Sequence, residues 1–355
     1  MDFVHDSLAR RIVFGPGRLR DLGAEIDAIG ARRVLLVTSK RQRPLLEPLV
    51  ADLGGRVAGV FDDTFKHVRV ETQRAAVAAA RDAGAECTVT IGGGSVIGIG
   101  KAVAVDTGLP VIAVPTTYSG SEMTPIYGLT EDGLKRTARD LRVMPVTVIY
   151  DPELTVELPA AVGGPSGMNA IAHAVEALYA ENENPITTMM AEEAIGALAD
   201  GLAGVAASPI DMEARSLALY GACLSGAALA SVGMAIHHKL CHALGGGFDL
   251  PHAEVHTIVL PHAVAYNQGA AAPAMGRIAR ALGALDAAQG LYDLAQALGA
   301  KMALRDIGMK EKDLDRAAEI ATTNPYYNPR PVTVEGVREL LDDAFRGIRP
   351  QAIPL

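Results

Sequence analysis

The sequence predicts an α/β N-terminal domain with a parallel dinucleotide-binding sheet, residues 1–161, followed by an all-helical C-terminal domain, residues 162–355. Three observations support this prediction. Over the first ~150 residues, short β-branched runs alternate with helical patterns, which is typical of βαβ units. From about residue 160, apolar residues recur at helical spacing and β-branched runs become rare. A length of 355 residues also favours two domains over one.

The expected elements follow in order along the chain. The strand candidates are 33–39, 56–63, 87–94, 110–117 and 146–152. Between them, the alanine-rich segment 71–84 ends in glycine and indicates a helix. Proline and glycine cluster at 159–165, where the domain boundary is expected. Beyond it, amphipathic patterns predict helices over 167–181, 187–207, 212–231 and 276–284.

Composition argues against several classes of protein. A net charge of -9 gives no electrostatic basis for binding nucleic acid or an anionic membrane. Cys87, Cys223 and Cys241 form no CxxC pair, which favours a reducing cytoplasmic compartment without disulfides. The N-terminus lacks an apolar signal core, and no stretch reaches the about 18 apolar residues of a membrane span. We therefore expect a cytoplasmic protein, and its apolar helical half makes a homodimer plausible.

The stretch TIGGGSVIGIGK (90–101) is the clearest chemical feature of the first half. Bare glycine backbone and a helix N-terminus after a buried strand could contact a pyrophosphate. Ile97 breaks the GxGxxG spacing, so a plain strand-to-helix turn is the alternative. The stretch PTTYSGSEMTP (115–125) places hydroxyl groups at the end of the next strand, where open α/β sheets bind ligands. The expected cofactor-binding residues are Ser39, Gly92, Gly93, Gly94, Ser95, Thr116, Thr117 and Ser119.

The first strand ends in Thr38, Ser39, Lys40 and Arg41, which bear on the choice of nucleotide. An acidic residue here would repel a ribose 2′-phosphate, and none is present. Both NADH and NADPH therefore stay open as cofactors. A solvated loop is the alternative interpretation of Lys40 and Arg41.

Histidines concentrate in HHKLCHALGGGFDLPH (237–252), which contains four of the nine in the chain. Asn169 and His173 share a helical face four residues apart, and His238 and His242 repeat that spacing. A turn before His252 would fold it back toward them. A divalent metal site is the first hypothesis for such a set. However, the amide of Asn169 is neutral, so these residues should bind a metal ion less tightly than a set with a carboxylate, and separate structural roles remain open.

Several motifs together resemble the iron-containing alcohol dehydrogenase family over most of the chain. They are GGGS (92–95), PTTYSGSE (115–122), DPELTVELP (151–159), MNAIAHAVEALY (168–179) and the histidine-rich run 237–267. The resemblance implies a dehydroquinate synthase-like architecture with NAD(P)H as cofactor. In metal-dependent members an Asp and three His hold iron or zinc, and these map onto Asn169, His173, His238 and His252. A histidine that the family places by the nicotinamide maps onto His242.

The Asn169 variant, HHKLCH, KRTARDLRVMP (135–145) and NPYYNPRPV (324–332) look like one subgroup of that family. The subgroup reduces maleylacetate to 3-oxoadipate in bacterial degradation of aromatic compounds. The resemblance therefore implies a small dicarboxylate substrate and no tightly held metal. A metal-dependent alcohol or polyol dehydrogenase is the alternative, and a catalytically silent nucleotide sensor is a third hypothesis.

The implied reaction needs two kinds of polar group. Hydride addition to the enone forms an enolate, and one preorganised donor to such an oxyanion contributes about 3 kcal/mol in other enzymes. Imidazoles suit both this task and the protonation that follows, so His242 and His252 are the expected catalytic groups, with His173 and His238 supporting them. Two carboxylates also need partners, because guanidinium and ammonium groups bind them well. The substrate-binding candidates are Arg330, Lys135 or Arg136, Asn169 and Tyr118, with surface solvation as the alternative for the charged ones.

Overall fold

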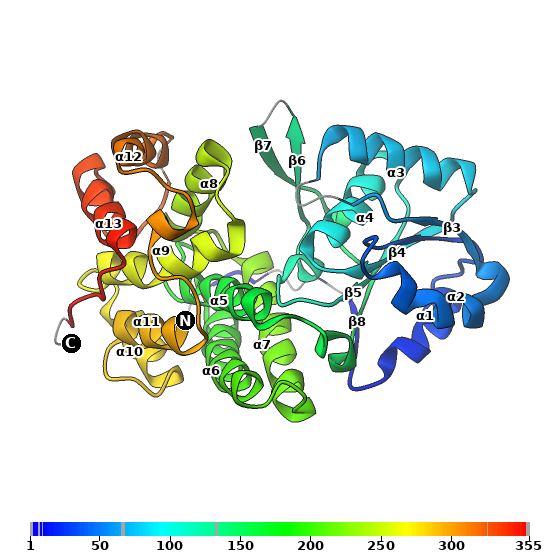
Figure 1. Cartoon of the computed structure of the whole chain (residues 1–355), viewed down its shortest axis with the longest axis horizontal. Coiled ribbons are helices and arrows are strands. Elements are labelled where there is room, and N and C mark those ends of the chain that lie inside the picture. Colours follow the sequence, from blue (N-terminus) through cyan, green and yellow to red (C-terminus); the bar gives the residue numbers. More distant parts are fainter. Residues whose placement is uncertain are drawn as a thin grey trace. The chain divides into compact units, whose positions relative to one another are not determined.

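The computed structural model describes residues 3–5, 8, 10–64, 68–131, 134–324 and 326–352, without the side chains of residues 45 and 131–136. The chain divides into two compact units (Figure 1). One unit is Leu8–Leu158, and the other is Pro159–Leu355 together with the N-terminal segment that includes Phe3. The division falls between residues 158 and 159, three residues before the predicted boundary between residues 161 and 162.

The first unit is built on a six-stranded sheet in which all the described pairs are parallel. Its order is β1-β8-β5-β4-β2-β3. The strands are β1 Arg11–Phe14, β2 Val34–Val37, β3 Val57–Phe61, β4 Cys87–Gly92, β5 Val111–Pro115 and β8 Thr147–Tyr150. Each of the five predicted strand segments contains one of them, so the parallel sheet is confirmed. The edge strand β1 was not predicted, because its four residues are partly exposed and too few to show the apolar run of a buried strand.

Helices cover both faces of this sheet (Figure 1). They are α1 Leu22–Ala28, α2 Glu47–Leu53, α3 Val70–Asp82 and α4 Gly94–Thr107. Leu36 packs with α1 and α2, whereas Leu35 and Val37 pack with α3 and α4, because successive strand residues point to opposite faces. Burial of both faces explains the unbroken apolar run of β2. The predicted helix 71–84 is α3, and Gly84, with a φ of 57°, follows its end.

A two-stranded antiparallel hairpin also belongs to this unit and was not among the expected elements. It consists of β6 Ile126–Glu131 and β7 Leu134–Arg139. The predicted substrate residue Lys135 and its neighbour Arg136 lie in β7, but their side chains are outside the described residues.

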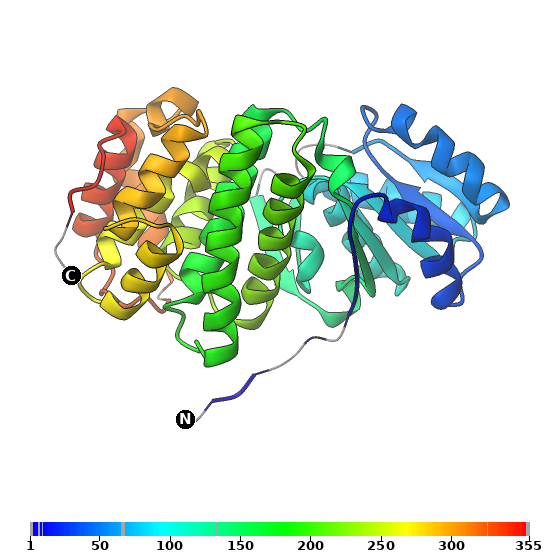
Figure 2. The same cartoon turned by 90° about the horizontal axis from the view of Figure 1, so that it is seen from below.

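The described residues of the second unit form helices joined by loops and no strand, as predicted (Figure 2). Its α-helices are α5 Ala160–Ala177, α6 Pro185–Ala207, α7 Met212–Ser231, α8 Ile236–Phe248, α9 His252–Asn267, α10 Ala272–Ala281, α11 Ala287–Ala297, α12 Leu314–Thr322 and α13 Val334–Arg346. Most of the proline and glycine cluster taken as a boundary lies inside α5 rather than before it. Pro165 lies beyond the first turn of α5, where proline both removes a backbone hydrogen bond and crowds the carbonyl four residues earlier, so the helix contains it at some cost in stability.

The helices were compared with the length and hydropathy that a membrane span requires. Among the described residues, no single helix is long and apolar enough to cross a membrane. Only α7 and α8, joined by a 97° bend, meet the length and composition requirement as a pair.

Glycines allow the backbones of α6 and α7 to come into direct contact. A Cβ atom at Gly201 of α6 would lie 2.4 Å from the backbone nitrogen of Ala218 in α7. At Gly221 of α7, a Cβ atom would lie 2.9 Å from the backbone nitrogen of Leu198 in α6. Because the obstacle in each case is backbone, a side chain here would force the two helices apart.

We expect Gly201→Ala to lower the free energy of unfolding by about 1–3 kcal/mol, the usual cost of overpacking. Chemical denaturation followed by circular dichroism measures it. Gly276→Ala in α10 is the matched control, since a Cβ atom there meets no heavy atom within 4 Å. The control should be neutral or stabilising by up to about 1 kcal/mol, as expected for Gly to Ala in a helix. A loss of the same size in both variants would contradict the packing explanation.

Candidate active site

The glycine-rich turn brings bare backbone against the segment that follows β5. A Cβ atom at Gly93 would lie 3.0 Å from the Thr117 side chain, and one at Gly94 would lie 3.1 Å from Oγ of Ser119. The fourteen-residue helix α4 begins here and has no side-chain cap. Its N-terminus is therefore suited to bind an anion such as a pyrophosphate. The structure thus brings the expected residues 92–95 and 116–119 together.

Ser39 lies at the same edge of the sheet. Its hydroxyl donates to Oε1 of Gln42 at 3.2 Å, and the Gln42 amide donates to Oγ1 of Thr116 at 2.9 Å. The carboxyl ends of β2, β4 and β5, which are neighbours in the sheet, therefore form one polar edge. Lys40 pairs with Asp63 on the surface at 2.8 Å, so its ammonium group already has a carboxylate partner.

Lys101, at the end of the glycine motif, organises the segment after Ser119 and was missed in the sequence analysis. Its side chain is fully buried, and its ammonium donates to the backbone oxygens of Ser121, Thr124 and Ile126. Burial lowers the pKa of Lys101 to about 7, while the nearby carboxylate of Glu122 favours its charged form. Its acceptors lie twenty or more residues further along the chain, so no local pattern marked this lysine.

In the helical unit, the histidine rings of α5, α8 and α9 form one cluster. The centroid of the His173 ring lies 5.1 Å from that of His238, and His238 lies 5.1 Å from His256. His252 lies 4.4 Å from His256, and His242 lies 6.4 Å from His238. The predicted convergence of His173, His238 and His252 is therefore found, with His256 between the rings of His238 and His252. Exposure increases across the cluster, from buried His173 and His238 through half-buried His252 to exposed His242.

Glu176 of α5 fixes the geometry of this cluster. Its fully buried carboxylate accepts from the backbone N–H groups of Ala235 at 2.9 Å and His237 at 2.7 Å. The start of α8 has no side-chain cap of its own, so Glu176 caps it from another helix. The same carboxylate accepts from Nδ1 of His238 at 2.7 Å. His238 is thereby held with Nδ1 protonated and Nε2 available.

Of the buried polar atoms in the cluster that have no hydrogen-bond partner among the described residues, three belong to residues predicted from the sequence to converge here. They are Oδ1 of Asn169, Nδ1 of His173 and Nε2 of His238. A buried polar atom left unpaired costs about 1–3 kcal/mol. Three such atoms in one place indicate a site where a bound molecule supplies the missing partners.

Burial also determines the charge of the innermost imidazoles. It lowers the pKa of His173, His237 and His256 well below the ordinary histidine value, and the neighbouring histidines lower it further. These rings are therefore neutral at neutral pH. Each can donate one N–H and accept at the other nitrogen.

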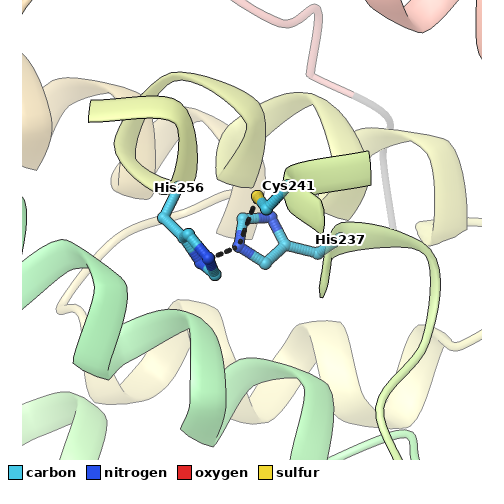
Figure 3. A group of neighbouring side chains, drawn as sticks. All are labelled: His237, Cys241 and His256. Carbon is cyan, nitrogen blue, oxygen red and sulfur yellow. Dashed lines mark hydrogen bonds between the residues drawn. The ribbon is translucent and has the colours of Figure 1, made fainter. Parts of the chain in front are cut away.

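His237, Cys241 and His256 form an inner group that the sequence analysis did not include (Figure 3). Nε2 of His237 lies 2.9 Å from Nδ1 of His256 and 3.6 Å from Sγ of Cys241. The available signal was the spacing, because 237/241 and 252/256 repeat the four-residue interval of 169/173 and 238/242.

The remaining predicted substrate residues are separate from this cluster or outside the described side chains. The Arg330 guanidinium lies 4.1 Å above the Tyr266 ring, and one of its N–H groups donates to the Tyr266 carbonyl at 3.3 Å. Its loop contacts the start of α8, where the Ile236 N–H donates to Oδ1 of Asn328 at 3.4 Å. Tyr118 is buried in the α/β unit, and the Lys135 side chain is not described. Their roles stay predictions.

The positions that correspond to the family's metal ligands offer an amide oxygen and three imidazoles, with no formal negative charge. The nearby carboxylate of Glu176 already accepts hydrogen bonds from His238 and from the backbone at the start of α8. A divalent cation is bound most tightly where anionic ligands offset its charge. This donor set is therefore expected to hold a divalent ion less tightly than one with a carboxylate in place of the amide.

Comparison with known proteins shows similarity along the whole chain. Residues 9–152 match the model of the iron-containing alcohol dehydrogenases, and residues 165–345 match the C-terminal model of the same family. A maleylacetate reductase of Burkholderia cepacia is 51% identical over 98% of this chain and 99% of its own. The crystal structure of maleylacetate reductase from Agrobacterium tumefaciens has a TM-score of 0.95 at 47% identity, covering 99% of this chain and 100% of that one. A putative alcohol dehydrogenase from Ralstonia eutropha JMP134 has a TM-score of 0.97 at 54% identity, covering 99% and 100%.

Buried neutral histidines also make the helical unit sensitive to acid. His262 of α9 is 5% exposed, and burial lowers its pKa to about 4. Between pH 6.5 and 4 the unfolded chain binds a proton at this position that the folded chain does not, so stability falls as the pH falls. We expect His262→Gln to reduce the slope of unfolding free energy against pH by up to about 1.4 kcal/mol per pH unit in this range. Urea titrations at several pH values measure the slope, and parallel curves for both proteins would refute the assignment.

Proposed function

The chain belongs to the iron-containing alcohol dehydrogenase family, and on that premise we propose that it reduces maleylacetate to 3-oxoadipate with NADH or NADPH. The observation that supports this most strongly is the similarity to maleylacetate reductases over nearly the full length of both chains. The glycine-rich edge of the α/β unit is the proposed cofactor site. The histidine cluster of the helical unit is the proposed site of proton transfer.

The reaction consists of one hydride transfer and one proton transfer. In maleylacetate, a 4-oxohex-2-enedioate, the hydride of NAD(P)H adds to the alkene carbon remote from the ketone. The π electrons of the alkene move toward the ketone, which becomes an enolate. A proton then adds to the carbon beside the ketone, and the products are 3-oxoadipate and NAD(P)⁺.

The histidines suit the two tasks that the enolate creates. Nδ1 of His173 and Nε2 of His238 lack partners among the described residues, so a bound oxygen could satisfy one or both. A proton on Nε2 of His238 would be balanced by the Glu176 carboxylate at Nδ1. His242 is exposed and His252 half-buried, which suits groups that exchange protons with water and deliver one to carbon. His242 and His252 are therefore the proposed catalytic groups, with His173 and His238 supporting them.

We propose further that turnover requires no tightly held metal ion. The support is the donor set itself, in which Asn169 supplies an amide where the family's metal-dependent members use a carboxylate. Stabilisation of the enolate then depends on imidazole N–H groups in a site where burial strengthens each hydrogen bond.

The test of this proposal follows NADH and NADPH oxidation with freshly prepared maleylacetate, before and after exhaustive chelation. Metal content is measured in both samples. We expect turnover to survive the removal of metal. Activity that disappears on chelation and returns only with iron or zinc would contradict the metal-free mechanism. Cofactor oxidation with alcohol-derived aldehydes but not with maleylacetate would contradict the substrate.

Glu176→Gln tests whether the buried carboxylate positions His238. The amide can still accept one hydrogen bond, but it cannot balance a proton on His238. We expect kcat to fall about 10- to 100-fold, as for other groups that orient a catalytic histidine. The KM for the cofactor should change little, because the proposed cofactor residues belong to the other unit. Glu181→Gln, an exposed glutamate five residues further on, is the matched control and should retain wild-type kinetics. A folded Glu176→Gln protein with unchanged kcat would refute the positioning role.

A further inference from the structure

A second group of metal-binding side chains lies beside the catalytic histidines. It consists of His237 and Cys241, one turn apart on α8, and His256 on α9 (Figure 3). All three are buried, and their ligand atoms lie within 4.8 Å of one another. None of the three corresponds to a position at which the family holds its metal.

The distances resemble those of a preformed tetrahedral site. Zinc bound to nitrogen at about 2.0 Å and to thiolate sulfur at about 2.3 Å places a nitrogen and a sulfur about 3.5 Å apart, and two nitrogens about 3.3 Å apart. Here Sγ of Cys241 lies 3.6 Å from Nε2 of His237, and that nitrogen lies 2.9 Å from Nδ1 of His256. The distance from the sulfur to His237 fits to about 0.1 Å, and the sulfur and Nδ1 of His256 lie within 4.8 Å of each other. The two nitrogens need to separate by only a few tenths of an ångström.

The chemistry of the three ligands favours a soft ion. A thiolate supplies the negative charge that the donor set of Asn169 and three histidines lacks. Sulfur with two imidazoles selects ions such as Zn²⁺ and Cu⁺ over iron or magnesium. Without an ion, burial and the nearby Glu176 raise the pKa of the Cys241 thiol well above its ordinary value, so the sulfur is protonated.

We propose that Nε2 of His237, Sγ of Cys241 and Nδ1 of His256 form a binding site for one thiophilic ion, Zn²⁺ or Cu⁺. On binding, the S–H bond of Cys241 breaks, its proton leaves to solvent and a sulfur–metal bond forms without any change of oxidation state. Two metal–nitrogen bonds replace the hydrogen bond between His237 and His256, and the proton of that hydrogen bond is lost from its nitrogen and taken up by the other nitrogen of the same ring, so both imidazoles stay neutral. The site is separate from the proposed function, because turnover needs no ion.

Cobalt distinguishes this site from the position used by the rest of the family. Chelated protein is titrated with Co²⁺ and observed in the near ultraviolet, where thiolate-bound cobalt shows a charge-transfer band. Coordination by nitrogen and oxygen alone produces none. We expect the band to reach its maximum at one ion per chain. It should be lost in Cys241→Ser and Cys241→Ala, which differ in packing but both lack the thiol.

Two matched controls retain the proposed ligands. Cys223→Ser removes another buried thiol, and His173→Asn removes an imidazole at the family's own metal position. Both should keep the charge-transfer band. Zn²⁺ and, under anaerobic conditions, Cu⁺ are then added to the cobalt protein, and the ion that abolishes the band at the lower free concentration is the preferred one.

Three results would overturn the proposal. They are failure of the wild-type protein to bind cobalt, cobalt binding without the thiolate band, and a band that persists in both Cys241 variants. Cobalt binding that is lost in His173→Asn but retained in Cys241→Ser would place the ion at the family's position instead. None of these results bears on metal-free turnover, which is measured separately on chelated enzyme.

Discussion

The buried carboxylate of Glu176 is the constraint on which the helical site depends. It joins α5 to the start of α8 through two backbone N–H groups, and its Oε2 also accepts from Nδ1 of the His238 ring and so orients that ring. A fully buried carboxylate is tolerated only when hydrogen bonds and a nearby positive charge compensate for the loss of water. The helix N-terminus supplies part of that charge through its dipole. The hydrogen bonds of Glu176 therefore both stabilise the packing of α5 with α8 and fix the orientation of His238.

Unpaired polar atoms in the cluster around this carboxylate lower the stability of the fold, so we expect them to serve a function. Asn169, His173 and His238 each contribute a buried polar atom without a partner among the described residues. In a protein interior such atoms are rare, because a lost hydrogen bond to water is not replaced. At a catalytic site the same atoms are preorganised donors and acceptors, which need no rearrangement when charge develops on the substrate. The unpaired atoms are thus best explained as the part of the site completed by substrate.

Local patterns in the sequence account for most of the fold and for part of the site. The central strands are continuous apolar runs because helices bury both their faces, and alanine-rich segments become helices, so both were predictable. Four-residue spacing also predicts which face Asn169 and His173 share. In contrast, Glu176 and His256 act through contacts between different helices, and no local pattern shows which helices will meet. Lys101 was missed for a similar reason, since its acceptors are backbone oxygens twenty or more residues away.

The location of negative charge gives a physical reason for asparagine at position 169. The proposed substrate has two carboxylates and gains further negative charge on oxygen as the hydride adds. An aspartate facing it without a bound cation would repel each of these charges, most strongly in a buried site where water screens little. Asn169 keeps a polar oxygen and removes that repulsion. The carboxylate that remains, Glu176, is bonded to His238 and to the start of α8, so its charge is partly neutralised and it can stabilise a protonated histidine. On the proposed function, turnover without a tightly held metal and a dianionic substrate would both follow from the asparagine at this position.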